Sequence, residues 1–312
     1  MADARLRVVV GPTAAGKSAV ALQLAERFGG AIVSADSRQL YRGFDIGTAA
    51  PTPDEQRRVP HYGIDVADPT ERYSAARWAS EARAWIADAD RRGLAPVVVG
   101  GTGFYVRALT NPIAEAPLLD AARRAALERA LRGIATPELR RWAAALDPAR
   151  AHLGRAQLLR AVETALLSGH RLSEWQAGAP AAPAVPARYL VVDPGRESLG
   201  ARIEERVAAM FAAGWAAEVR ALTQWVPADA PAWNASGYDA VRRLVAGELT
   251  VEAARQRVVV ATRQYAKRQR TWIRHQLAGE DVTWLDPRSA DAAAVAVAWW
   301  HGEPVPRTAA ET

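Results

Sequence analysis

The sequence predicts an α/β fold in which a parallel β-sheet with flanking helices carries an inserted helical domain. Short apolar runs at 6–10, 31–35 and 95–99 alternate with helical segments such as 73–92. This alternation is typical of a parallel sheet with crossover helices. From residue 118 to 176 the sequence reads as Ala/Leu/Arg-rich helices without strands. The chain of 312 residues is long enough to form two domains.

The first apolar run ends in a glycine-rich loop that matches G-x-x-x-x-G-K-[ST] between a strand and a helix, the context that this motif requires. Inward-turned backbone N–H groups, the positive end of the following helix and Lys17 bind polyphosphate, while the Ser18 hydroxyl can ligate Mg²⁺. The motif therefore predicts a P-loop NTPase-like fold. Its polyphosphate site consists of Gly11, Pro12, Thr13, Ala14, Ala15, Gly16, Lys17 and Ser18.

The use of basic residues singles out the lysine of this loop. Of the 40 Lys plus Arg residues, only Lys17 and Lys267 are Lys. In a chain that uses Arg at nearly all its basic positions, a Lys indicates that its site requires this residue. A compact ammonium group fits a tight phosphate loop, whereas the planar guanidinium group is bulkier.

Polar residues follow the next two strands. Asp36 ends the segment AIVSAD, and Thr102 follows two glycines after the strand at 95–99. Both positions lie at the carboxyl edge of the sheet, where such folds bind reactants. Asp36 could instead cap the following helix. An ATPase of this fold carries an acid at the end of the later strand to hold magnesium and its water, and this chain has none there.

Changes in composition mark the domain boundaries. Proline-rich sequence appears at 112–117, and the segment GAPAAPAVPA at 178–187 reads as a linker. We therefore predict a discontinuous core domain, 1–111 and 188–302, an inserted helical domain, 112–187, and a frayed tail, 303–312. After the linker, RYLVVD predicts a returning strand.

The remaining sequence predicts helices from residue 199, a long helix at 251–277 and a short strand at 282–286. Between residues 253 and 279 there are seven basic residues and no acid, so the net charge of +6 arises in this segment. Four of these basic residues are spaced i, i+4, i+7 and i+11, which places them on one face of a helix. They are Arg263, Lys267, Arg270 and Arg274. This face is either solvated or a stripe that binds RNA phosphates.

The composition excludes other kinds of site. The chain has no Cys, so it has neither disulfides nor a thiolate zinc site, which fits a reducing compartment. Its five His are scattered without metal-ligand spacing, and no apolar run approaches the length of a membrane helix. We expect a soluble, cytoplasmic, monomeric protein that does not bind a membrane and lacks a targeting segment.

Seven sequence blocks, in order, resemble one enzyme family. They are GPTAAGKS (11–18), SADSRQLYRGFDIGTAAP (34–51), VPHYGIDV (59–66), DPTERYSA (68–75), VVVGGTGFYVRAL (97–109), RIEERVAAMFAAGWAAEVRAL (202–222) and ATRQYAKRQRTW (261–272). Together they resemble the tRNA dimethylallyltransferases, which modify the adenosine on the 3′ side of the anticodon. The resemblance extends over about residues 8–286.

The resemblance implies that the loop binds dimethylallyl diphosphate and that the diphosphate is a leaving group, with Mg²⁺ bound by Ser18. It implies that Asp36 accepts the proton of the adenine amine and that Thr102 hydrogen-bonds the bridging oxygen of the diphosphate. Arg202 would be a further diphosphate contact. The adenine has to flip out of its stack to reach such a site.

The resemblance also implies contacts with the anticodon stem-loop of tRNA. The residues concerned are Asp36, Ser37, Arg38, Gln39, Arg123, Gln157, Arg160, Gly237, Tyr238, Arg263, Lys267, Arg268, Gln269, Arg270, Trp272 and Arg274.

Three alternatives remain open at this stage. An adenylate isopentenyltransferase shares the loop and the Asp-Ser-Arg segment but needs neither the helical insertion nor the basic stripe. A small-molecule kinase or NTPase is disfavoured by the missing acid. A non-catalytic RNA-binding protein with a vestigial loop is disfavoured by Lys17.

Overall fold

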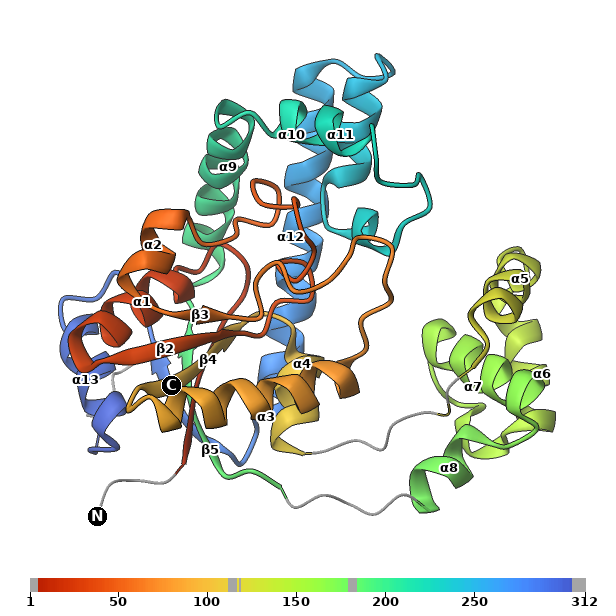
Figure 1. The fold of residues 1–312 in the computed structure, drawn as a ribbon, viewed down its shortest axis with the longest axis horizontal. Helices are drawn as coiled ribbons and strands as arrows, with labels where there is room; N and C mark the ends of the chain where they lie inside the picture. Colours follow the sequence, from red (N-terminus) through yellow and green to blue (C-terminus); the bar gives the residue numbers. More distant parts are fainter. Residues whose placement is uncertain (1–4, 112–116, 118, 179–183, 305–312) are drawn as a thin grey trace. The chain divides into compact units, whose positions relative to one another are not determined.

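The computed structural model describes residues 5–111, 117, 119–178 and 184–304. The chain forms two compact units, which Figure 1 shows. The first comprises Met1–Thr110 and Ala184–Thr312, and the second comprises Asn111–Pro183. The sequence-based division set these boundaries a few residues away, at 112 and 187. Half of the predicted linker and most of the predicted tail lie outside the described residues.

A parallel sheet forms the centre of the first unit, as predicted. Its strand order is β3-β2-β4-β1-β5-β6, and every pairing is parallel. The strands are β1 (Leu6–Val10), β2 (Gly30–Ser34), β3 (His61–Tyr62), β4 (Ala95–Gly100), β5 (Ala187–Val192) and β6 (Asp281–Leu285). The sequence did not predict β3, because two residues are too few to show an alternating pattern.

Helices of the first unit pack around this sheet. They are α1 (Lys17–Phe28), α2 (Pro53–Arg58), α3 (Ala75–Arg91), α4 (Gly103–Thr110), α9 (Arg196–Ala212), α10 (Trp215–Leu222), α11 (Tyr238–Val245), α12 (Val251–Gln276) and α13 (Ala292–His301). Helix α1 packs on β2, β4 and α13, while α3 packs on α4. Helices α9, α10, α11 and α12 pack against one another in series and rise together on one side of the sheet (Figure 1).

Strand register brings three loops to one edge of the sheet. Val10 pairs with Gly100, and Ser34 pairs with Val99, so β1, β4 and β2 end at the same level. The side chains in the centre of these strands are buried, and their burial stabilises the sheet. The loops after these three strands therefore lie side by side at the carboxyl edge, where parallel sheets bind ligands.

The second unit consists of helices with a core of their own. Its helices are α5 (Ala121–Leu131), α6 (Thr136–Leu146), the 3₁₀ helix η1 (Pro148–Arg150), α7 (Arg155–Ser168) and α8 (Leu172–Gly178). The core residues are Leu131, Leu139, Ala143, Leu158 and Val162. No helix among the described residues of either unit is both long and apolar enough to cross a membrane.

Candidate active site

The loop between β1 and α1 has the backbone of a phosphate-binding loop. Gly16 precedes α1 with φ +98°, a conformation that glycine adopts without strain. Lys17 and Ser18 follow in the first turn of the helix, and Ser18 is exposed. Burial and, to a smaller extent, the nearby Arg206 cation lower the pKa of Lys17 to about 8, and Asp36 opposes both effects. The loop therefore concentrates positive potential before any anion is bound.

Two distant helices hold this loop. On α9, the Nε of Arg202 donates a hydrogen bond to the carbonyl oxygen of Ala14 at 3.0 Å. On α12, the side chain of Gln269 accepts from the Thr13 N–H at 2.8 Å and donates to the carbonyl oxygen of Gly101 at 2.9 Å. The conformation of the phosphate loop thus depends on residues that lie far away in sequence.

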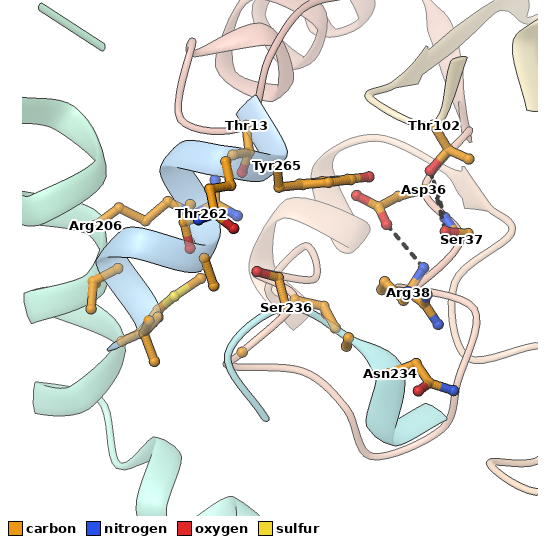
Figure 2. A pocket seen from close by; sticks show the side chains of 18 of the residues that line it. Thr13, Asp36, Ser37, Arg38, Thr102, Arg206, Asn234, Ser236, Thr262 and Tyr265 are labelled. Atoms are coloured by element: carbon orange, nitrogen blue, oxygen red, sulfur yellow. Dashed lines mark hydrogen bonds between the residues drawn. The ribbon is translucent and has the colours of Figure 1, made fainter. Parts of the chain in front are cut away.

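Asp36 and Thr102 lie together beside the loop (Figure 2). One carboxylate oxygen of Asp36 accepts a hydrogen bond from the Arg38 N–H at 2.9 Å, so Asp36 does cap its own turn. The Thr102 hydroxyl oxygen accepts from the Ser37 N–H at 3.1 Å. These contacts do not use the second carboxylate oxygen of Asp36. The Thr102 hydroxyl has a long contact of 3.3 Å to the Ser37 hydroxyl and also interacts with the Tyr265 phenol.

A cavity of about 510 Å³ joins these groups. Figure 2 shows Asp36, Thr102 and Ser37 on one side and Arg206 on the other. The walls also include the apolar side chains of Val207, Met210, Trp215, Ala235, Val258 and Ala261. A mostly apolar cavity with a few convergent polar groups is typical of a small-molecule reaction site.

The sequence analysis did not identify Arg206 and Tyr265 as residues of this cavity. Arg206 lies one turn after Arg202 on α9; burial lowers the pKa of its guanidinium and Asp36 opposes the shift. The i, i+4 spacing of the two arginines in ARIEER was the available signal. Tyr265 lies on α12 and extends toward Asp36 (Figure 2).

Gly237 and Tyr238, two of the predicted RNA contacts, pack against Trp215 and Glu218 within the protein. Tyr238 is fully buried, and its hydroxyl donates to Glu218 at 2.7 Å. Gly237 has φ +94°, and a Cβ there would collide with the Trp215 ring. The same Glu218 carboxylate accepts from the Ile46 N–H at 2.6 Å. These residues therefore support the cavity walls from the protein interior.

Other predicted RNA contacts are also engaged within the protein. Gln269 is buried and holds the phosphate loop, as described above. The Gln39 side chain accepts from the Ser34 hydroxyl at 2.9 Å and donates to the carbonyl oxygen of Ala49 at 2.9 Å. Trp272 packs on Gly103, where a Cβ would collide with its ring. These side chains position the loops beside the cavity.

The four cations of the basic stripe line one groove between α9 and α12, as their spacing predicts. Their charge is partly neutralised, because Arg270 pairs with Asp193 at 2.9 Å and Arg263 pairs with Glu204. For Lys267 and Arg274, no acidic partner is found among the described residues. The stripe lies on the opposite side of α12 from Tyr265 and Arg268, which line the cavity.

Three further predicted RNA contacts belong to the helical unit. Arg123 lies in the first turn of α5, where its N–H bonds to Asp120. Gln157 caps α7 by accepting from the Gly154 N–H at 3.2 Å. Arg160 lies 3.8 Å from the buried carboxylate of Glu163. Gln157 and Arg160 therefore make local side-chain contacts, whereas the contact of Arg123 is made by its backbone.

The donor set at the loop restricts how a metal could bind. Among the described residues no group of three or more His, Asp or Glu side chains is arranged to hold a metal ion. Ser18 is the exposed hydroxyl in the first turn of α1. Magnesium retains several waters and binds through substrate phosphates with few protein ligands. A magnesium ion bound jointly by a diphosphate and Ser18 fits this donor set.

The fold and the site define an α/β protein in which a P-loop-like loop and a carboxylate contribute to one cavity. Comparison with known proteins gives the family. The family model described as IPP transferase matches residues 39–276, and the model described as isopentenyl transferase matches residues 4–62.

Curated relatives and solved structures agree with these matches. A tRNA dimethylallyltransferase of Anaeromyxobacter sp. (strain K) is 45% identical over 91% of this chain and 93% of its own length. A tRNA dimethylallyltransferase of Geobacter metallireducens is 43% identical over 90% and 92%. The structure of the tRNA isopentenylpyrophosphate transferase of Bacillus halodurans has a TM-score of 0.63 at 33% identity, covering 91% of this chain and 90% of that one. The chain belongs to the tRNA dimethylallyltransferase family.

Proposed function

We propose that this enzyme transfers the dimethylallyl group of dimethylallyl diphosphate to the exocyclic N6 amine of an adenosine in tRNA, the one on the 3′ side of the anticodon, and releases diphosphate. The observation that carries this proposal is the placement of a phosphate loop and the Asp36 carboxylate around one cavity. The names of the relatives, tRNA dimethylallyltransferases, support the same reaction.

The loop binds the diphosphate and offsets its growing charge. An allylic carbon shares positive charge as its C–O bond breaks, so negative charge collects on the departing diphosphate. Lys17 in the loop and the nearby Arg206, whose charges interact, would stabilise this negative charge electrostatically. Bound by Ser18 and the diphosphate, Mg²⁺ would supply further positive charge to the leaving group.

Asp36 accepts the proton of the adenine amine. The Arg38 N–H occupies one of its carboxylate oxygens, which fixes the orientation of the carboxylate and leaves the other oxygen for the amine. An exocyclic amine is a poor nucleophile, and removal of its proton during bond formation contributes about 10²–10⁴-fold. The Thr102 oxygen accepts from the Ser37 N–H, and its hydroxyl proton would turn from the Ser37 and Tyr265 hydroxyls toward the bridging oxygen of the diphosphate.

The basic residues of α12 contribute to tRNA binding. Arg268 lines the cavity, whereas Lys267 and Arg274 line the groove on the other side of the helix. Phosphate contacts of this kind supply affinity without sequence preference. The adenine enters the cavity by flipping out of the anticodon loop, and Ser37 and Arg38 lie at the position where it arrives.

Incubation with dimethylallyl diphosphate and Mg²⁺ tests the proposal. Unmodified tRNA and AMP serve as alternative acceptors, and the nucleosides are analysed by mass. We expect one five-carbon unit on adenosine of the tRNA and none on AMP. Modification of AMP alone would identify an adenylate isopentenyltransferase, which contradicts the proposal.

A further inference from the structure

Tyr265 is an aromatic side chain in the reaction cavity for which the steps above have no role. Figure 2 shows its ring extending from α12 across the cavity toward Asp36. The other aromatic residue that lines the cavity, Trp215, is fully buried beneath the walls. Among the described lining residues, Tyr265 is therefore the aromatic side chain that reaches the reacting groups.

Neighbouring groups hold the Tyr265 ring in place. The guanidinium of Arg268, one turn further along α12, lies over the ring at 5.7 Å from its centroid. At its other end the phenol lies among Asp36, Thr102 and Arg38; burial and the Asp36 charge raise its pKa, while interaction with the Thr102 hydroxyl opposes this. The phenol is thus a neutral side chain at the pH of catalysis.

The proposed reaction has a competing outcome in such a cavity. A cavity of about 510 Å³ has room for water beside a five-carbon group. Water is a small nucleophile that captures an electron-deficient allylic carbon as readily as a poor amine does. Exclusion of water prevents such side reactions, and the face of an aromatic ring attracts a neighbouring positive charge.

We propose that Tyr265 selects the nucleophile: its ring covers the reacting allylic carbon, so that the adenine amine, and not water, bonds to this carbon. This inference rests on the proposed function. In transfer, the carbon–oxygen bond of dimethylallyl diphosphate breaks and the carbon bonds to N6. The diphosphate leaves with the electron pair, and the N6 proton passes to Asp36. In the competing reaction water supplies the new carbon–oxygen bond and loses a proton to solvent, which gives dimethylallyl alcohol and diphosphate.

The ratio of diphosphate released to dimethylallyl groups transferred to tRNA tests this role. We expect a ratio near one for the unchanged protein and for Tyr265→Phe, which keeps the ring. For Tyr265→Ala we expect diphosphate to exceed transfer by about threefold or more, with dimethylallyl alcohol as the extra product, because water enters the opened space. Tyr265→Leu refills part of that space and should give an intermediate ratio.

The control is Val260→Ala, an exposed position on the same helix outside the cavity, which should leave the ratio near one. A Tyr265→Ala protein that is slow but still releases one diphosphate per transfer overturns the inference. So does a Tyr265→Phe protein that is as uncoupled as the Ala variant, because the hydroxyl and not the ring would then be responsible. Absence of any transfer by the unchanged protein would instead refute the proposed function.

Discussion

The Gln269 side chain on α12 accepts a hydrogen bond from the backbone N–H of Thr13 in the phosphate loop, a residue 256 positions earlier in the chain. The same amide donates to the carbonyl oxygen of Gly101, just before Thr102. One buried side chain therefore sets the distance between the two loops that are proposed to hold the two ends of the leaving diphosphate.

Replacement of Gln269 with Ala should weaken diphosphate binding and destabilise the fold. Removing a buried amide leaves its partners unsatisfied, which costs about 1–3 kcal/mol per group. Thermal unfolding and the KM for dimethylallyl diphosphate measure the two effects. Gln256→Ala, an exposed position on the same helix, is the matched control. Equal behaviour of the two variants would show that the contact does not hold the loop.

Replacement of Asp36 with Asn should abolish prenyl transfer while diphosphate binding is nearly retained. The Asn side-chain oxygen can still accept from the Arg38 N–H, so the turn is preserved, but the amide cannot accept the amine proton. We expect kcat to fall about 10²–10⁴-fold, with the Kd for dimethylallyl diphosphate changed little. Loss of both activities together would indicate that Asp36 acts mainly as a cap.

The value of kcat/KM for dimethylallyl diphosphate should fall above about pH 8. Lys17 in the free protein has a pKa of about 8, mainly because of burial, and its neutral form attracts a diphosphate less. A bound diphosphate stabilises the ammonium form, so kcat should decline only at higher pH. A pH profile of kcat/KM that stays flat to pH 10 would show that the Lys17 charge is not needed.

The Arg206 side chain provides a check on this pH dependence. Arg206 lowers the pKa of Lys17 through repulsion of like charges, so Arg206→Gln should raise it. The alkaline decline of kcat/KM then moves to higher pH, while the KM itself increases because a cation has been lost from the cavity. A shift toward lower pH would contradict the assigned arrangement.

In the α9–α12 groove, Lys267 and Arg274 should contribute more to the salt dependence of tRNA binding than the two arginines that form ion pairs with acids. Lys267→Gln with Arg274→Gln removes two cations that have no acidic partner among the described residues. This should flatten the slope of log K against log salt by about 1.4, at roughly 0.7 per contact with single-stranded RNA. Arg263→Gln with Arg270→Gln should change it less, because Glu204 and Asp193 already neutralise those charges. Equal effects of the two double variants would contradict this distinction.

Local sequence patterns were sufficient for the elements that meet at the sheet edge. The strand, loop and helix around Lys17 follow from a motif with fixed spacing. Asp36 and Thr102 were identified because the carboxyl ends of parallel strands meet at one edge. The long helix was predicted at 251–277 and is observed at Val251–Gln276, since its length makes the helical pattern unambiguous.

Contacts between distant segments could not be predicted in the same way. Helical periodicity placed Arg263 and Arg270 on one face, but it does not show that Glu204 and Asp193 face them. Nor does it show that Gln269 points into the protein. The burial of Tyr238 follows from Trp215 and Glu218, which lie on another helix, so local sequence could not predict it.

The central claim is that the anion in the phosphate loop leaves from carbon and is not transferred as a phosphoryl group. Dimethylallyl diphosphate labelled with ¹⁸O at the bridging position tests it in one turnover with unmodified tRNA. Cleavage between carbon and oxygen, which we predict, leaves all the label in the released diphosphate, while the tRNA adenine gains an unlabelled five-carbon group. Label recovered in dimethylallyl alcohol, with the diphosphoryl group on an acceptor, would contradict the account. So would label in dimethylallyl phosphate, with the terminal phosphoryl group on an acceptor.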